Sequence, residues 1–293
     1  MTLTQGLTRD QAALDQWYVL GALRDFPKGQ TIATRLLGGA VTVTRSDDGI
    51  TVTGEGRALP VRTDYNHLWT SFGAPARDVF ALPEAAEVDR RWIYCGGVHV
   101  RASGLRLIEN FLDLAHFPYV HTDILGSEAK PEVAKYDVEQ RRDVDELWAT
   151  KCEFFQPKAA AASDEGQISQ YMYRVVSPFN VMLYKTPPTA PNRWDVIALF
   201  VQPLDQTESV AHPFMLVIDD TSTDAEIIGF QQMIFLQDKI VLENQRPLLL
   251  PLQPGRETPT RADLSSVLYR RWLKEKALTF GTEPRTDGVA ALA

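Results

Sequence analysis

The amino-acid sequence predicts an α+β protein in which a small β unit precedes a larger antiparallel sheet and a long helix. Short strand-like segments separated by turn residues fill residues 1–100. Three longer β-type runs follow over residues 139–155, 170–183 and 193–219, and a segment of helical period over 223–242 comes after them. Strands joined by short turns pair antiparallel, so we expect one antiparallel sheet with the helix packed on it.

The small β unit is expected to contain several short strands bounded by Gly, Pro and Asp. These strands cover residues 16–22, 31–37, 40–45, 50–54, 67–72 and 91–95. We therefore place the domain boundary at residue 100, with residues 1–100 in one domain and residues 101–293 in the other.

Three helices are expected after this unit. The first covers residues 105–117. The second is the best marked, because Thr223 and Glu226 have the spacing of a capping box and Pro247 follows the last apolar residue. The third covers residues 262–278.

Composition excludes several classes of function. The formal net charge of -8 gives no basic surface for nucleic acid or for an anionic membrane. No apolar stretch approaches the roughly 20 residues that span a bilayer, and the N-terminus lacks a signal-peptide pattern. The two cysteines, Cys95 and Cys152, stand apart among apolar neighbours, as expected for thiols in a reducing compartment. We therefore expect a cytoplasmic protein.

Polar side chains interrupt the first apolar helix. Asn110, Asp113 and His116 follow one another at intervals that place them on one helical stripe. On a continuous helix His121 would point about 140° away from His116. Pro118 disfavours helical geometry at the residue before it, so we expect the chain to turn there and bring both imidazoles together. The pair favours a metal site, and the alternative is two satisfied core histidines.

Asp238 is expected on the apolar face of the long helix, because apolar residues flank it at helical spacing. A buried carboxylate is costly unless it is paired or bound to metal. Together with His116 and His121 it makes two imidazoles and one carboxylate, the facial triad that suits iron(II). The alternative is an ion pair of Asp238 with Lys239 or with an arginine such as Arg270.

Candidate substrate contacts lie near Asp238 on the same helix. Gln231, Ile234 and Phe235 share its face, and Gln231 offers a hydrogen bond to a bound molecule. In the run SPFNVMLYK, Asn180 and Tyr184 reach the same cavity if their strand faces inward.

The segment NFLDLAHFPYVH, followed by DILG, resembles the iron-binding signature of the Rieske-type non-haem iron oxygenases. RADLSSVLYRRWL resembles their demethylating monooxygenase branch, and the resemblance covers about residues 100–280. It implies a helix-grip catalytic domain that binds Fe(2+) through His116, His121 and Asp238. It further implies that Asp113 passes electrons between subunits through hydrogen bonds and that Asn110 is a polar neighbour of the iron.

One feature of that family is missing from the sequence. Its members carry an N-terminal Rieske domain whose [2Fe-2S] cluster needs paired Cys-x-His and Cys-x-x-His motifs. Neither motif occurs here, although QWYVLGAL and DYNHLWTSFGAP resemble outer strands of that domain. We expect residues 1–100 to be a degenerate Rieske-like domain without cluster ligands. His67, His99 and His212 lack nearby cysteine partners, and we expect all three to be structural.

In this departure the chain is similar to the cluster-less demethylase subunits of bacterial caffeine degradation, which remove the N7 methyl group of methylxanthines. The similarity implies a monooxygenase that uses dioxygen, hydroxylates an N-methyl carbon of a small aromatic heterocycle and releases formaldehyde. It also implies an oligomer that receives electrons from a separate Rieske-bearing reductase or from a cluster-bearing oxygenase subunit. The alternatives are a non-catalytic subunit that stabilises a complete oxygenase and a helix-grip protein that only binds a small molecule.

Overall fold

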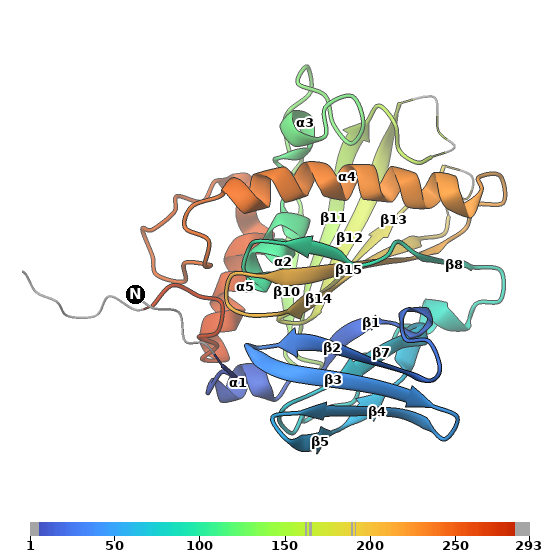
Figure 1. Cartoon of the computed structure of the whole chain (residues 1–293). Helices are drawn as coiled ribbons and strands as arrows, with labels where there is room; N and C mark the ends of the chain where they lie inside the picture. The colour runs from blue at the N-terminus through green and yellow to red at the C-terminus, as the bar shows by residue number, and fades with distance from the viewer. Residues whose placement is uncertain (1–5, 162, 164–165, 189, 191, 285–293) are drawn as a thin grey trace, which may run out of the picture.

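The computed structural model describes residues 6–161, 163, 166–188, 190 and 192–284. Its elements form three layers: a small β unit, a large antiparallel sheet, and helix α4 (Asp224–Asn244), which crosses the other face of that sheet (Figure 1). This combination of helices with antiparallel sheets confirms the predicted α+β class.

The small β unit consists of two sheets, with strand orders β1-β7-β6 and β2-β3-β4-β5. Every pairing in it is antiparallel, because short turns connect most successive strands. Its elements are α1 (Gln11–Leu14), β1 (Tyr18–Ala22), η1 (Leu23–Asp25), β2 (Gln30–Leu36), β3 (Gly39–Ser46), β4 (Gly49–Gly54), β5 (Arg57–Leu59), β6 (Val61–Arg62), η2 (Asp64–Asn66) and β7 (His67–Thr70).

The large sheet has the strand order β10-β11-β12-β13-β14-β15-β8, and β9 also pairs with β15. Each of the three expected β runs is a hairpin of two strands. The elements are η3 (Pro83–Ala86), β8 (Arg91–Tyr94), β9 (Val98–Val100), β10 (Asp137–Arg141), β11 (Glu146–Gln156), β12 (Gln167–Ser177), β13 (Asn180–Lys185), β14 (Asp195–Pro203) and β15 (Ser209–Val217).

The strand expected over residues 91–95 does not belong to the small unit. It forms β8, which pairs with β15 at the edge of the large sheet. Residues 98–100 likewise pair with β15 as β9. The boundary expected at residue 100 therefore comes too late in the chain. The sequence could not reveal this, because the residue pattern of a strand does not specify which other strand it pairs with.

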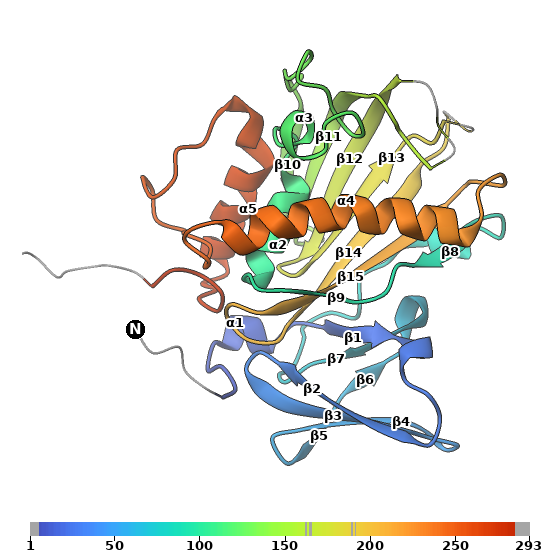
Figure 2. The same ribbon diagram turned by 45° about the horizontal axis from the view of Figure 1, so that its top comes forward.

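The two faces of the large sheet have different neighbours because successive side chains of a strand point to opposite faces. On one face, Met182 and Phe200 form a hydrophobic cluster with Val19 and Trp69 of the small unit. The Trp69 and Phe200 rings lie 5.0 Å apart. The small unit thus covers this face, and the opposite face is turned toward α4 (Figure 2).

The first long helix is shorter than expected. α2 (Gly104–Leu112) ends at Asp113, whose backbone is extended with φ -83° and ψ 122°. Asp113 Oδ1 accepts a hydrogen bond from Ala115 N at 2.7 Å, which competes with continued helix. α3 (Phe117–Val120) then carries Pro118 in its first turn, where proline is tolerated. The chain therefore turns at Asp113, and the expected polar stripe on one continuous helix does not form.

The long helix agrees with expectation. Thr223 caps α4 by accepting from Glu226 N, and the Glu226 side chain accepts from Thr223 N, which completes the predicted capping box. The third helix begins as η4 (Arg261–Asp263) and continues as α5 (Leu264–Glu275). Among the described residues, none of these helices combines the length and apolar character needed to cross a bilayer.

Two of the three histidines predicted to be structural are buried in the cores. The His67 ring packs against Tyr94, Phe200 and Phe214, and burial lowers its pKa to about 4. Burial also lowers the pKa of His212 to about 3. His99 differs, because its side chain is 50% exposed.

These lowered pKa values predict that acid destabilises the fold. Below an ordinary pKa of about 6.5 the unfolded chain binds protons, whereas buried His67 stays neutral until about pH 4. Stability is therefore lost as pH falls from about 6.5 toward 4, by about 2 kcal/mol for His67 between pH 7.5 and pH 5. Urea unfolding at both pH values should show a smaller loss in His67→Gln than in the native protein. The matched variant His99→Gln should keep the native loss, and equal losses in all three proteins would contradict the prediction.

Candidate active site

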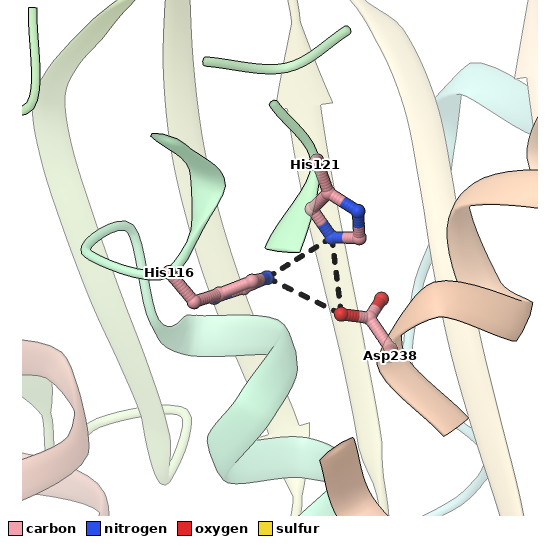
Figure 3. Close-up of side chains that lie close together, drawn as sticks. All are labelled: His116, His121 and Asp238. Atoms are coloured by element: carbon pink, nitrogen blue, oxygen red, sulfur yellow. Dashed lines mark hydrogen bonds and ion pairs between the residues drawn. The ribbon is translucent and has the colours of Figure 1, made fainter. Parts of the chain in front are cut away.

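Two short loops and one long helix bring three side chains with metal-binding atoms together. His116 is the N-cap of α3 and His121 is its C-cap. Because α3 is a single turn, the two imidazoles approach closely, and their Nε2 atoms lie 3.1 Å apart. Asp238 comes from the face of α4 that is turned toward the sheet (Figure 3).

The three donor atoms form a nearly regular triangle. Asp238 Oδ1 lies 3.3 Å from His116 Nε2 and 3.0 Å from His121 Nε2. All three side chains are shielded from solvent, with 12%, 1% and 15% of the His116, His121 and Asp238 side chains exposed. These residues are the same three that the sequence predicted as iron ligands, and the fold places them in contact.

Neighbouring polar groups fix the orientation of each ring. His121 Nδ1 donates to Gln237 Oε1 at 2.8 Å, and His116 Nδ1 donates to Asp113 Oδ2 at 3.3 Å. With Nδ1 engaged in this way, each ring presents Nε2 to the centre of the triangle, where it can bind a proton or a metal ion. Asn110 Nδ2 lies 3.4 Å from Asp238 Oδ1 and donates to it.

The electrostatics of the triangle favour a cation. Burial acts to lower the pKa of His116, but hydrogen bonds to Asp113 and Asp238 outweigh burial and raise it to about 9. Burial acts to raise the pKa of Asp238, but its contacts with His116 and His121 lower it below the usual range. Both shifts favour a positive charge inside the triangle: a proton on His116 can supply it, and a bound metal ion would take the place of that proton.

The donor set fits a divalent metal ion. Ligand atoms at right angles and about 2.1 Å from an ion lie about 3 Å from each other, which is the spacing of this triangle. Two imidazoles and one carboxylate occupy one face of an octahedron and leave the opposite face open. The arrangement can therefore hold a transition metal while substrate or dioxygen approaches from the other side.

The alternative partners for Asp238 are engaged elsewhere. Lys239 pairs with Glu243 at 2.5 Å, and Arg270 pairs with Glu109 and Glu257. Among the described residues, the ion pairs of Asp238 are with His116 and His121. The expectation of a structural ion pair with lysine or arginine is therefore wrong.

A cavity extends from the triangle between α4 and the sheet. Gln231, Ile234 and Phe235 of α4 line it, as the helical spacing predicted for substrate contacts. Polar residues on the sheet side also line the cavity, among them Gln156 and Lys185, and were not predicted from the sequence. Alternation along the strand that carries Leu183 could have indicated Lys185, because residues two apart share a face.

Asn180 and Tyr184 do not line this cavity. Leu183 and Lys185 of β13 face it, so the even-numbered residues of the strand point to the opposite face. Asn180 Nδ2 donates to Ser177 Oγ at 2.7 Å, and Tyr184 belongs to the hydrophobic cluster beneath the small unit. The expectation that Asn180 contacts substrate is therefore corrected.

A buried ion network supports the helix that carries Asn110. Arg106, with 1% of its side chain exposed, bonds Glu109 at 2.8 Å and Glu257 at 2.7 Å. Arg270 of α5 contacts the same two carboxylates. The network joins α2 to α5 and to the segment between α4 and α5.

The chain is similar in sequence and in fold to several known oxygenases and demethylases. Residues 100–279 match the model of the vanillate O-demethylase oxygenase C-terminal domain. The chain is 48% identical over 271 residues to a protein of Pseudomonas sp. (strain TJI-51) named probable methylxanthine N7-demethylase NdmC, covering 92% of this chain and 96% of that protein. The structure of Pseudomonas putida CBB5 NdmA with caffeine has a TM-score of 0.74 at 16% identity, covering 91% of this chain and 92% of that chain. Dicamba monooxygenase bound to dicamba has a TM-score of 0.70 at 15% identity, covering 90% and 97%.

The fold and these matches define an oxygenase catalytic subunit of the Rieske-oxygenase class, and hence an oxidoreductase. More specifically, the chain belongs to the family of the vanillate O-demethylase oxygenase C-terminal domain. The resemblance carried by NFLDLAHFPYVH is thereby confirmed. The two solved structures confirm the expected catalytic fold.

The ion network predicts a large cost for removing one of its charges. Glu109→Ala leaves buried Arg106 with an incomplete set of partners, so we expect a loss of about 3 kcal/mol in the free energy of unfolding. Asp143→Ala is the matched control, because Asp143 is 61% exposed and solvent screens its ion pair with Arg141, so this variant should lose much less stability. Guanidinium unfolding of both variants tests this. Similar losses in the free energy of unfolding would show that removing a charge from the buried network costs no more than removing an exposed one.

Proposed function

We propose that this chain is a mononuclear non-haem iron monooxygenase that removes the N7 methyl group of a methylxanthine. The observation that carries the proposal is the triangle of His116, His121 and Asp238 at one end of a largely apolar cavity. The substrate is inferred from the relative named methylxanthine N7-demethylase, which is similar over nearly the whole chain.

The residues of the triangle would hold Fe(2+) through His116 Nε2, His121 Nε2 and Asp238 Oδ1. Bound there, iron would supply the activation of dioxygen needed to oxidise a methyl carbon. Asp113 and Gln237 hold the two rings in the tautomer that leaves Nε2 free.

The cavity wall is suited to a flat heterocycle. Ile234 and Phe235 are 9% and 5% exposed and offer an apolar surface to the ring. Gln231 is 8% exposed and also lines the cavity, where its amide can hydrogen-bond a ring atom. In the net reaction the N-methyl group, dioxygen, two electrons and two protons give an N-hydroxymethyl group and water. The N-hydroxymethyl group then releases formaldehyde and leaves N–H.

The electrons are proposed to come from another protein. A Rieske cluster needs two cysteines and two histidines, and the only cysteines are Cys95 and Cys152. Both thiols are free and buried, and they lie in the large sheet rather than in the small β unit, Cys95 directly after β8 and Cys152 in β11. We infer a chain without its own cluster, a Rieske-bearing reductase as donor, and a cytoplasmic oligomer as the working form.

Asp113 is the proposed point of electron entry. Its side chain is 29% exposed, it bonds His116, and it borders a surface hollow that α5 lines with Val267, Arg270 and Arg271. This hollow lies on a different side of His116 from most of the substrate cavity, because among the described residues only Asn110 and His116 line both. A donor protein could therefore reach Asp113 without blocking the substrate.

Metal content tests the ligand assignment. Purified protein loaded anaerobically with ferrous ion should retain about one iron per chain, whereas His116→Ala and Asp238→Ala should lose it. Gln237→Leu should keep all three ligands but bind iron about 10- to 100-fold more weakly, because the His121 ring is no longer held. His99→Ala is the matched histidine control and should retain iron. Iron retained by His116→Ala, or absent from the native protein, would leave only a binding or stabilising role.

Turnover tests the route of the electrons. With a Rieske-bearing reductase and NADH, the native protein should release formaldehyde from 7-methylxanthine. Asp113→Asn should bind iron normally but lose at least about 100-fold in kcat, because the hydrogen bond to His116 no longer involves a carboxylate. Formaldehyde release and iron content should be measured on the same samples. Unchanged kcat in Asp113→Asn would reject Asp113 as the entry point, and no turnover by native iron-loaded protein would favour the non-catalytic alternatives.

A further inference from the structure

Polar side chains form a row across the sheet at one edge of the cavity floor. The antiparallel register places Tyr171 of β12 beside Lys185 of β13, and Lys185 beside Asp195 of β14. All three line the same cavity as the metal-binding triangle. Figure 2 shows these strands side by side beneath α4. The next row along the same strands is Tyr173, Leu183 and Ile197, so the floor changes from apolar to charged.

Lys185 and Asp195 are not paired with each other, although they are neighbours in the register. Lys185 Nζ donates to Ala159 O, and Asp195 Oδ1 accepts from Ile218 N at 2.7 Å. No ion pair between the two is found within the described residues, so each retains hydrogen-bonding capacity. A donor and an acceptor thus stand next to each other at the cavity wall.

A third polar group on this wall is poorly paired. Gln156 ends β11, is 1% exposed and lines the cavity, and both atoms of its amide lack a hydrogen bond within the described structure. The Tyr171 hydroxyl likewise makes no hydrogen bond of normal geometry, although it lies close enough to Gln156 and Ser169 for both to act on its pKa. Leaving a buried polar group unpaired costs about 1–3 kcal/mol, so these groups favour a ligand that pairs with them.

Lys185 and Asp195 both carry charge near neutral pH, which suits them to hydrogen-bond a ligand. Burial lowers the pKa of Lys185 to about 8 and raises the pKa of Asp195 to about 6. Around pH 7 most Lys185 side chains therefore remain donors and most Asp195 side chains remain acceptors. Both charged groups are only weakly solvated, which strengthens any hydrogen bond that they make to a ligand.

We propose that Lys185 and Asp195 recognise a lactam edge of the substrate, a ring carbonyl adjacent to a ring N–H. Lys185 Nζ donates to the carbonyl oxygen, and the Asp195 carboxylate accepts from the N–H. The Gln156 amide, which is both donor and acceptor, supports the same edge. This inference rests on the proposed function, because a methylxanthine with its N7 methyl at the triangle directs its pyrimidine ring away from the metal-binding residues.

The consequence is a preference for substrates whose pyrimidine nitrogens carry hydrogen. A methyl group in place of the hydrogen removes the donor, leaves the Asp195 carboxylate unpaired and adds bulk at the same point. The carbonyl oxygen is present in both kinds of substrate. Lys185 therefore affects kcat/KM for both kinds of substrate, whereas Asp195 determines the preference for substrates whose ring nitrogen carries hydrogen.

Matched substrates separate the two roles. We expect kcat/KM for formaldehyde release to be at least about 30-fold higher for 7-methylxanthine than for caffeine, whose pyrimidine nitrogens are both methylated. Asp195→Asn still accepts from Ile218 N but turns its NH₂ group to the cavity, so it should reduce this ratio to about threefold or less. Lys185→Met should lower kcat/KM about 10-fold or more for both substrates and keep their ratio. Asp137→Asn, an exposed carboxylate on β10, is the matched control and should change neither value.

Equilibrium binding distinguishes a failure of this inference from a failure of the proposed function. Dissociation constants of xanthine and of 1,3-dimethylxanthine can be measured without turnover, and xanthine should bind more tightly to the native protein but not to Asp195→Asn. A native preference retained by Asp195→Asn in both binding and turnover would overturn the lactam site. A preference lost from binding in Asp195→Asn, with no formaldehyde from any methylxanthine, would sustain the site and reject the demethylase.

Discussion

The structure depends on one local constraint, the approach of three electron-rich atoms to within 3.3 Å of one another. Two imidazoles and a carboxylate gather this closely where a cation, a proton or a metal ion, offsets the repulsion of their electron-rich atoms, and the surrounding fold holds them in place. The single turn of α3 sets the spacing of the histidines, and the capped α4 presents Asp238. Asp113 and Gln237 fix the rings. The site is thus built on elements held by packing on both sides.

The large sheet serves two purposes because its two faces are buried against different partners. One face packs on the small β unit through Trp69 and Phe200, and the other forms the cavity floor beneath α4. This arrangement gives the small unit a structural role in the fold. Without it, a hydrophobic sheet face would be open to solvent.

The fold class, the capping box of α4 and the three residues that converge at the candidate site could be predicted because each depends on local pattern. Capping at Thr223 is decided within one turn, and the resemblance around His116 is contiguous in sequence. The turn at Asp113 was misplaced because proline was given more weight than a side-chain hydrogen bond that competes with the helix. Asn180 was misassigned because the face of a strand depends on its register.

By itself the sequence determined which residues are candidates for the chemistry: two histidines and an aspartate in apolar surroundings, with helical spacing that put Gln231 beside Asp238. Only the tertiary structure decided which residues, distant in the chain, become their neighbours. Lys185 and Asp195 are neighbours because β13 and β14 pair in one register, and strand β8 belongs to the large sheet because β15 offers it an edge. Such pairings join residues that are distant in the chain, and a local pattern fixes the type of an element but not its partner.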